Sequence, residues 1–178
     1  MGLIAIRGFR EADWPRLQAI HDAARMDELR LAGLEGAFLP LSVAAQREGA
    51  AILTPHDGEF ARLSGCELPI RDRLGAAAEF ARRHRCTLVL KGFRTVISAG
   101  GTCVVNPTGN PGMAKGGSGD ALAGLMGALA AQGVPDAPIL AVWLHGQAGD
   151  LAAQDKGEYG MTPSDLVEQI PYAIKELT

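Results

Sequence analysis

A glycine-rich stretch between residues 106 and 124 carries the residue types best suited to chemistry in this chain. It reads N-P-T-G-N-P-G-M-A-K-G-G-S-G-D-A-L-A-G and changes, from Ala121 onward, to the small apolar residues of a helix. The amides of a first helical turn have no acceptor within the helix, and glycines in front of them let an anion come close. The stretch therefore predicts a phosphate cradle formed by Gly116, Gly117, Ser118 and Gly119.

Asp120 follows this cradle directly. A carboxylate there could cap the helix, or it could accept a proton from a hydroxyl group beside a bound phosphate. A Gly-Gly-Ser-Gly run is also typical of a flexible surface linker, so the pattern alone leaves both interpretations open. The stretch is not a Walker A loop, because Ala114 stands where the second glycine belongs and Gly116 follows Lys115 where serine or threonine is required.

Two further polar turns follow short apolar runs that are typical of buried strands. The first is T-P-H-D-G-E after residues 51–53, and the second is K-G-F-R-T after residues 87–90. Open α/β folds bind ligands at the carboxyl ends of their strands. His56 could therefore face a site, or His56 and Glu59 could be loop and capping residues. Lys91 is either a solvated lysine or a phosphate contact.

The elements that must position these residues alternate between strands and helices. Apolar periodicity predicts helices at residues 14–31, 71–84, 120–132, 138–152 and 161–177, and a β-hairpin from residues 96–97 and 103–105. Thr162 and Pro163 are expected to cap and begin the last helix, and His145 is expected mainly to pack within its helix. This alternation predicts an α/β fold with a largely parallel sheet covered by helices.

Length and composition restrict the class of protein. The 178 residues suit one domain, and 47% apolar with 21% charged residues is typical of a globular chain. A net charge of −3 gives no general attraction to nucleic acid or to an anionic membrane, so we expect a small-molecule partner. Three cysteines without C-x-x-C spacing indicate a reducing compartment, and no secretory signal or membrane span is seen. We therefore expect a cytoplasmic protein.

The two polar turns and the glycine-rich stretch form a set of three turns. Together and in this order they are highly specific evidence for a family, whereas each turn alone would be weak evidence. With L-H-G-Q-A-G-D at residues 144–150, they closely resemble the ADP-dependent NAD(P)H-hydrate dehydratases, a branch of the ribokinase-like fold. The resemblance covers about residues 48–178. It implies a repair reaction, in which hydrated NADH or NADPH is phosphorylated by ADP (or ATP) and phosphate is eliminated to restore the dihydronicotinamide.

The resemblance also implies roles for individual residues. Asp120 would be the catalytic base that accepts the hydroxyl proton, and His56 together with Asp120 would contact the hydrated substrate. Mg²⁺ is expected on phosphate oxygens, without metal-ligating residues of its own. The nucleotide would be bound by Lys91, Gly92, Phe93, Arg94, Thr95, Gly116, Gly117, Ser118 and Gly119.

The N-terminal segment departs from the family. Residues 1–47 lack the G-P-G-L-G-type loop and the D-A-D-type strand end that family members carry before the first turn. We therefore expect a single domain, residues 1–178, which combines a divergent N-terminal segment (residues 1–47) with the C-terminal portion of the dehydratase domain (residues 48–178). Loss of strands would leave an open sheet edge, which predicts a homo-oligomer.

Two other functions remain open. A truncated, non-catalytic homologue would keep the cradle and bind nucleotide without turnover. A small-molecule kinase of the ribokinase fold would share the G-x-G-D pattern before a helix, but the T-P-H-D-G-E turn argues against it.

Overall fold

The computed structural model describes residues 51–177. The helix predicted at residues 14–31 and the divergent segment of residues 1–47 lie outside the described residues. In chain order the described elements are β1 (Ile52–Leu53), α3 (Asp57–Ser64), α4 (Arg73–His84), β2 (Thr87–Leu90), β3 (Val96–Ala99), β4 (Thr102–Val105), the 3₁₀ turn η3 (Pro111–Met113), α5 (Ser118–Ala131), α6 (Ala137–Gly160) and α7 (Pro163–Lys175). The prediction of an α/β fold is confirmed.

The four described strands form one sheet in the order β1-β2-β3-β4. β1 and β2 are parallel, with α3 and α4 as the crossover between them, whereas β2 with β3 and β3 with β4 are antiparallel. Gly100 and Gly101 join β3 to β4 with φ angles of 54° and 87°, which is the backbone of a tight hairpin. A tight hairpin must reverse the chain direction, so the described sheet is mixed and the prediction of a largely parallel sheet is wrong for these strands.

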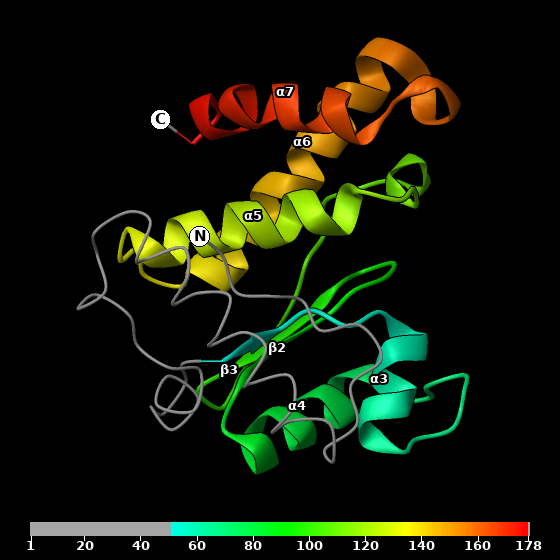
Figure 1. The fold of residues 1–178 in the computed structure, drawn as a ribbon, viewed down its shortest axis with the longest axis vertical. Coiled ribbons are helices and arrows are strands. Elements are labelled where there is room, and N and C mark those ends of the chain that lie inside the picture. Colours follow the sequence, from blue (N-terminus) through cyan, green and yellow to red (C-terminus); the bar gives the residue numbers. More distant parts are fainter. Residues whose placement is uncertain (1–50, 178) are drawn as a thin grey trace, which may run out of the picture.

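Helices cover both faces of this sheet. Figure 1 shows α3 and α4 on one face and α5 and α6 on the other, with α7 packed beyond α5 and α6. Successive side chains of a strand point to opposite faces, and β2 follows this rule. Leu88 and Leu90 belong to a buried cluster with Phe60 and Phe80 of α3 and α4, whereas Val89 belongs to a second cluster with residues of α5 and α6. All four residues of β2 are buried, as expected for a central strand.

The last two helices form a corner that later supports the glycine-rich loop. α6 is interrupted at Gly157, where φ is 71° and ψ is 155°, and the helix ends three residues later, shortly before α7 begins. Thr162 caps α7 and Pro163 begins it, as predicted, and the capping box is completed by Asp165. The Lys156 ammonium and the Thr162 hydroxyl hold the pKa of the Asp165 carboxyl at about 2.

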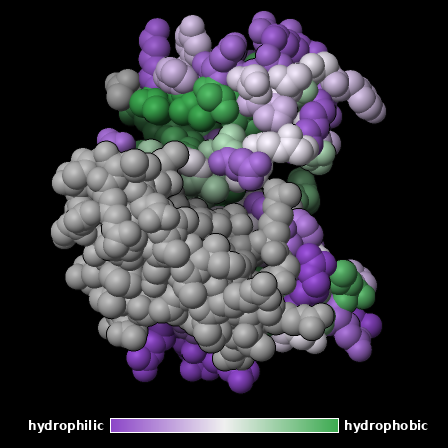
Figure 2. Space-filling model, viewed as in Figure 1, coloured by the Kyte–Doolittle hydropathy of each residue, from purple (hydrophilic) through white to green (hydrophobic). Residues whose placement is uncertain are grey.

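On the face shown in Figure 2, an apolar area lies at the end of the molecule where α7 lies (green, upper left). The exposed apolar side chains of α7 and the residues after it include Val167, Ile174 and Leu177. None of the helices within residues 51–177 is long and apolar enough to cross a lipid bilayer.

Candidate active site

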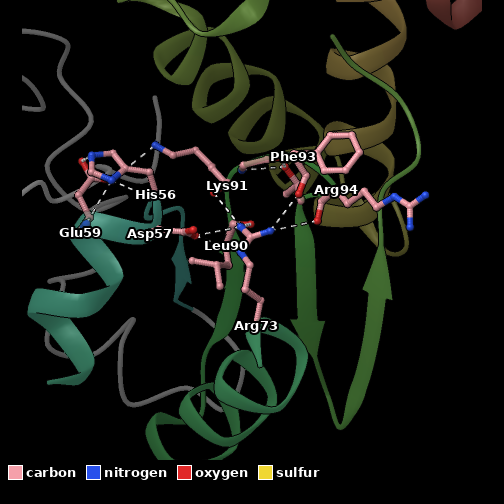
Figure 3. Close-up of polar contacts among 10 residues, drawn as sticks. His56, Asp57, Glu59, Arg73, Leu90, Lys91, Phe93 and Arg94 are labelled. Carbon is pink, nitrogen blue, oxygen red and sulfur yellow. Dashed lines mark hydrogen bonds and ion pairs between the residues drawn. The ribbon is translucent and has the colours of Figure 1, made fainter. Parts of the chain in front are cut away.

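The two polar turns predicted at strand ends lie side by side. His56 and Lys91 form a parallel bridge that continues the pairing of β1 with β2, and the Lys91 amide donates to the Pro55 carbonyl over 2.8 Å. Figure 3 shows both turns at the carboxyl ends of the strands, above α4. The fold therefore brings together His56 and Lys91, which are 35 positions apart in the sequence.

His56 caps helix α3. Its Nδ1 accepts a hydrogen bond from the Glu59 amide over 3.2 Å, and a Glu59 carboxylate oxygen accepts from the His56 amide over 2.8 Å. This reciprocal arrangement is a capping box. The capping role of His56 and Glu59 is thus confirmed. The His56 side chain remains 55% exposed, so one side of the ring is accessible to a ligand.

Lys91 is not a fully solvated lysine. Its Nζ lies 3.7 Å from a carboxylate oxygen of Glu59, and Glu59 is buried. Figure 3 shows the Lys91 side chain extending from the end of β2 toward the start of α3. Its positive charge also reaches the buried ring of His145 on α6, whose pKa it helps to lower. Lys91 therefore places a cation between α3 and the helices on the other side of the sheet.

Arg73 holds the turn that follows Lys91. From the first position of α4, its guanidinium donates to the carbonyls of Leu90 (3.1 Å) and Lys91 (2.9 Å). It also donates to the Phe93 carbonyl over 3.0 Å and to the Asp57 carboxylate over 3.1 Å. These contacts occupy the centre of Figure 3. One planar cation thus fixes the end of β2, the turn and the start of α3 together.

Arg73 was not among the site residues predicted from the sequence, which placed it only within the helix expected at residues 71–84. One signal was available, since a positive charge in the first turn of a helix is unfavourable to the helix dipole and needs another reason to be there. The Arg73 guanidinium also gives a reason for a glycine at position 92, because a Cβ there would lie 2.8 Å from an Arg73 nitrogen.

The turn itself presents an exposed surface. Thr95 closes it, because its hydroxyl donates to the Gly92 carbonyl over 3.0 Å. Phe93 is 88% exposed, and the Arg94 guanidinium carbon lies 5.5 Å from the centre of its ring. A flat apolar ring beside a cation suits a planar, negatively charged ligand such as a nucleotide.

The predicted cradle forms the start of α5. Gly117 is the N-cap residue with φ of 100°, and Ser118 is the first residue of the helix. The Gly117 carbonyl accepts from the amides of Asp120 and Ala121, whereas among the described residues the amides of Gly117 and Gly119 have no backbone acceptor. A Cβ on Gly116 would meet nothing within 4 Å, so the approach to the loop is open there.

Asp120 is the third residue of α5 and is exposed. The helix was predicted to begin at this residue, but it begins two residues earlier, because the left-handed conformation at Gly117 ends the loop. The interpretation of Asp120 as the N-cap residue is therefore wrong. Its carboxylate lies in the first helical turn, next to the amides of the cradle.

The L-H-G-Q-A-G-D segment lies in the middle of α6, where it supports the glycine-rich loop. A Cβ on Gly146 would collide with Thr108, and one on Gly149 would collide with Met113. Asp150 accepts hydrogen bonds from the Gly109 amide (2.8 Å) and from the Asn110 side chain (2.9 Å). The two glycines let the loop approach the helix closely, and the aspartate fixes it.

His145 acts on the cradle itself. Its Nε2 lies 2.9 Å from the Ser118 carbonyl, and because a carbonyl can only accept, Nε2 must carry the proton. Burial lowers the pKa of His145 from its ordinary 6.5, the hydrogen bond to Ser118 opposes this, and the charge of Lys91 adds to the lowering. His145 is buried as predicted, but it does more than pack, since it holds the first residue of α5.

A model of the NAD(P)H-hydrate dehydratase family matches residues 34–172. The chain belongs to this family. Among its relatives is the bifunctional NAD(P)H-hydrate repair enzyme Nnr of Moorella thermoacetica, which is 47% identical over 134 residues, or 72% of this chain and 25% of the relative. The resemblance found from the three turns is thereby confirmed.

Solved structures of relatives agree with the fold. The crystal structure of the ADP/ATP-dependent NAD(P)H-hydrate dehydratase from Bacillus subtilis, co-crystallised with ATP/Mg²⁺, matches with a TM-score of 0.68 and 35% identity over 71% of this chain and 48% of that one. A ribokinase-like superfamily protein from Enterococcus faecalis matches with a TM-score of 0.65 and 32% identity over 80% of this chain and 48% of that one. The ribokinase-like fold is thus confirmed, and the chain spans about half the length of these solved relatives.

Residues 51–177 contain no cluster of three or more His, Cys, Asp or Glu side chains that could hold a metal ion. Mg²⁺ in nucleotide sites commonly binds through the phosphate oxygens together with one or two carboxylates.

Proposed function

We propose that the chain catalyses the ADP- or ATP-dependent dehydration of hydrated NADH or NADPH. The observation that carries this proposal is the exposed Asp120 carboxylate in the first turn of α5, beside glycine amides that have no backbone acceptor among the described residues. At the first turn of α5, the Asp120 carboxylate can accept a proton from a substrate hydroxyl group, and the glycine amides can donate hydrogen bonds to a phosphoryl group. Family membership supplies the identity of the substrates.

In this proposal each described residue has a separate task. The amides of Gly116, Gly117 and Gly119 hold the transferred phosphoryl group, whose negative charge the helix N-terminus stabilises. The hydroxyl oxygen of the hydrated ring attacks the terminal phosphorus of the nucleotide, and the hydroxyl proton passes to the Asp120 carboxylate. The bond from that phosphorus to the bridging oxygen breaks, so AMP leaves when the donor is ADP and ADP leaves when it is ATP. Phosphate then leaves with cleavage of the ring carbon–oxygen bond, and loss of a proton from the adjacent ring carbon restores the ring double bond.

Three other parts of the site bind and orient the nucleotide and the hydrated substrate. Lys91 and the turn that ends at Thr95 bind the nucleotide phosphates and base, and the exposed side of the His56 ring contacts the hydrated nicotinamide nucleotide. Mg²⁺, when bound with the nucleotide, neutralises phosphate charge.

The test compares Asp120→Asn with Asp136→Asn. Asp136 is an exposed aspartate at the start of α6, beyond the far end of α5, and its left-handed backbone suits asparagine. Recovery of dihydronicotinamide absorbance is measured with NADH hydrate, Mg²⁺ and either ADP or ATP. We expect Asp120→Asn to lower kcat by at least about 100-fold while the Kd for ADP changes by less than about threefold, and Asp136→Asn to match wild type. Unchanged turnover in Asp120→Asn would remove it from the role of base.

One observation favours a second candidate, a non-catalytic nucleotide-binding homologue. The chain spans 48% of the length of the solved dehydratase from Bacillus subtilis that it matches. Nucleotide binding without nucleotide-dependent recovery of absorbance, in the wild-type protein, would favour this candidate. The faster nucleotide in the same assay identifies the preferred phosphate donor.

We also propose that the protein is a homo-oligomer. β1 and β4 each pair with only one of the described strands, and a strand at the edge of a sheet can pair with a second chain. Light scattering coupled to size exclusion tests this, and a monomer at every concentration would contradict it. The cytoplasmic location and the boundary near residue 48 stay predictions.

A further inference from the structure

Lys115, the residue directly before the cradle, points away from it. Its Nζ donates to the backbone carbonyls of Glu158 (3.0 Å), Tyr159 (3.2 Å) and Met161. An ammonium group has three N–H donors, and three carbonyls here accept from it. Lys115 therefore resembles a phosphate-binding lysine only in sequence, because its donors are already engaged.

The three carbonyls belong to the corner where α6 ends. The break at Gly157 interrupts the helix, and carbonyls at a helical C-terminus lack intrahelical donors and carry partial negative charge. A cation is therefore the group that this corner requires. Lys115 supplies it from a segment more than 40 positions earlier in the chain.

The backbone of Lys115 connects this cation to the cradle. Its carbonyl accepts from the Ser118 amide over 3.3 Å, and this turn presents the amides of Gly116 and Gly117. A Cβ on Gly117 would lie 3.3 Å from the Pro163 ring, so the loop also rests on the start of α7. Displacing the ammonium would let the whole turn move relative to α5.

We propose that Lys115 is a positioning residue, whose ammonium acts as an internal cation at the α6–α7 corner and thereby fixes the cradle amides. It follows that a free alkylammonium ion can replace the side chain. The expected effect of Lys115 on kcat rests on the proposed function, whereas its expected effect on hydrogen exchange of the cradle does not. Propylammonium is the matching probe for Lys115→Ala, since its three carbons and nitrogen replace Cγ, Cδ, Cε and Nζ.

The experiment uses the full chain with Lys115→Ala, Lys115→Met and, as a matched control, Lys156→Ala. Lys156 is on the same corner but makes an exposed ion pair with Asp165. Hydrogen exchange of the peptide that covers residues 114–121 reports on the cradle without any need for activity. We expect exchange there to become at least about tenfold faster in both Lys115 variants, and propylammonium, but not 1-propanol, to restore protection in Lys115→Ala.

The kinetic readout separates positioning from binding. A cradle displaced by about 1 Å is expected to lower kcat by about 10- to 100-fold, with the KM for ADP changing by less than about threefold. Propylammonium should restore kcat of Lys115→Ala in a saturable manner and leave wild type, Lys115→Met and Lys156→Ala unaffected. The long methionine side chain fills the position without a charge, so Lys115→Met should not be rescued.

The proposal is overturned if either Lys115 variant keeps wild-type exchange at residues 114–121, or if 1-propanol restores Lys115→Ala as well as propylammonium does. It is also overturned if lost protection in Lys115→Ala does not return with propylammonium. An inactive wild-type protein would instead contradict the proposed function, and the exchange measurements would still decide the role of Lys115.

Discussion

Replacement of Arg73 by methionine tests how the nucleotide turn is held. Methionine keeps most of the apolar length of the side chain and removes all five N–H donors, so the change affects hydrogen bonds more than packing. Two carbonyl acceptors, those of Leu90 and Lys91, are partly buried where Arg73 reaches them. The Phe93 carbonyl is exposed and can bond to water instead.

The expected loss of stability follows from these contacts. Each of the two partly buried carbonyls costs about 1–1.5 kcal/mol when it loses its donor, and the half-exposed pair with Asp57 adds less than about 1 kcal/mol. The free energy of unfolding should therefore fall by about 2–4 kcal/mol. Because the turn from Lys91 to Thr95 loses its anchor, the Kd for ADP should also rise by about tenfold.

Arg82→Met is the matched control, because Arg82 lies on the same helix and pairs with Glu79 at the exposed surface. That change should cost less than about 0.5 kcal/mol and leave the Kd for ADP unchanged. Urea denaturation followed by circular dichroism and calorimetric titration with ADP measure the two quantities. Equal destabilisation by Arg73→Met and Arg82→Met would refute the reasoning.

Three more predictions concern the cradle and its surroundings. Lys91→Ala should raise the Kd for ADP by about tenfold in calorimetric titration, because it removes the cation beside Glu59 at the end of β2, and an unchanged Kd would contradict this. Because burial lowers the pKa of His145, the unfolded state binds more protons than the folded state below pH 6.5. The free energy of unfolding should therefore fall as the pH drops below 6.5. In His145→Gln, the free energy of unfolding measured with urea should depend less steeply on pH. Gly146→Ala should cost about 1–3 kcal/mol, because its Cβ meets the loop, whereas Gly124→Ala, with open space around it, should stabilise α5 by about 0.5–1 kcal/mol; similar effects in thermal denaturation would refute the packing argument.

Most of the described helices, the hairpin and the family could be predicted from the order of residues alone. The helix predicted at residues 138–152 was too short, because α6 continues to Gly160, and α3 was not among the helices predicted from apolar periodicity. Apolar periodicity located α4, α5 and α7 to within two residues at most boundaries, and Thr162 with Pro163 predicted the start of the last helix. These features are local, because helix periodicity and capping depend on residues within one or two turns. The three turns predicted the dehydratase family because their combination and order are specific to that family, whereas no single turn identifies a reaction.

The residues that hold the candidate site together could be found only in the folded chain. Arg73 and His145 reach partners 17 to 27 positions away, and Lys115 reaches partners more than 40 positions away. Apart from the Asp57 carboxylate beside Arg73, these partners are backbone carbonyls, which every residue possesses, so no pattern of side chains in the sequence records these contacts. Likewise Asp120 is the third residue of α5 rather than its cap only because Gly117 adopts a left-handed conformation against α7. The sequence supplies the donors, and only the fold selects the carbonyls that they meet.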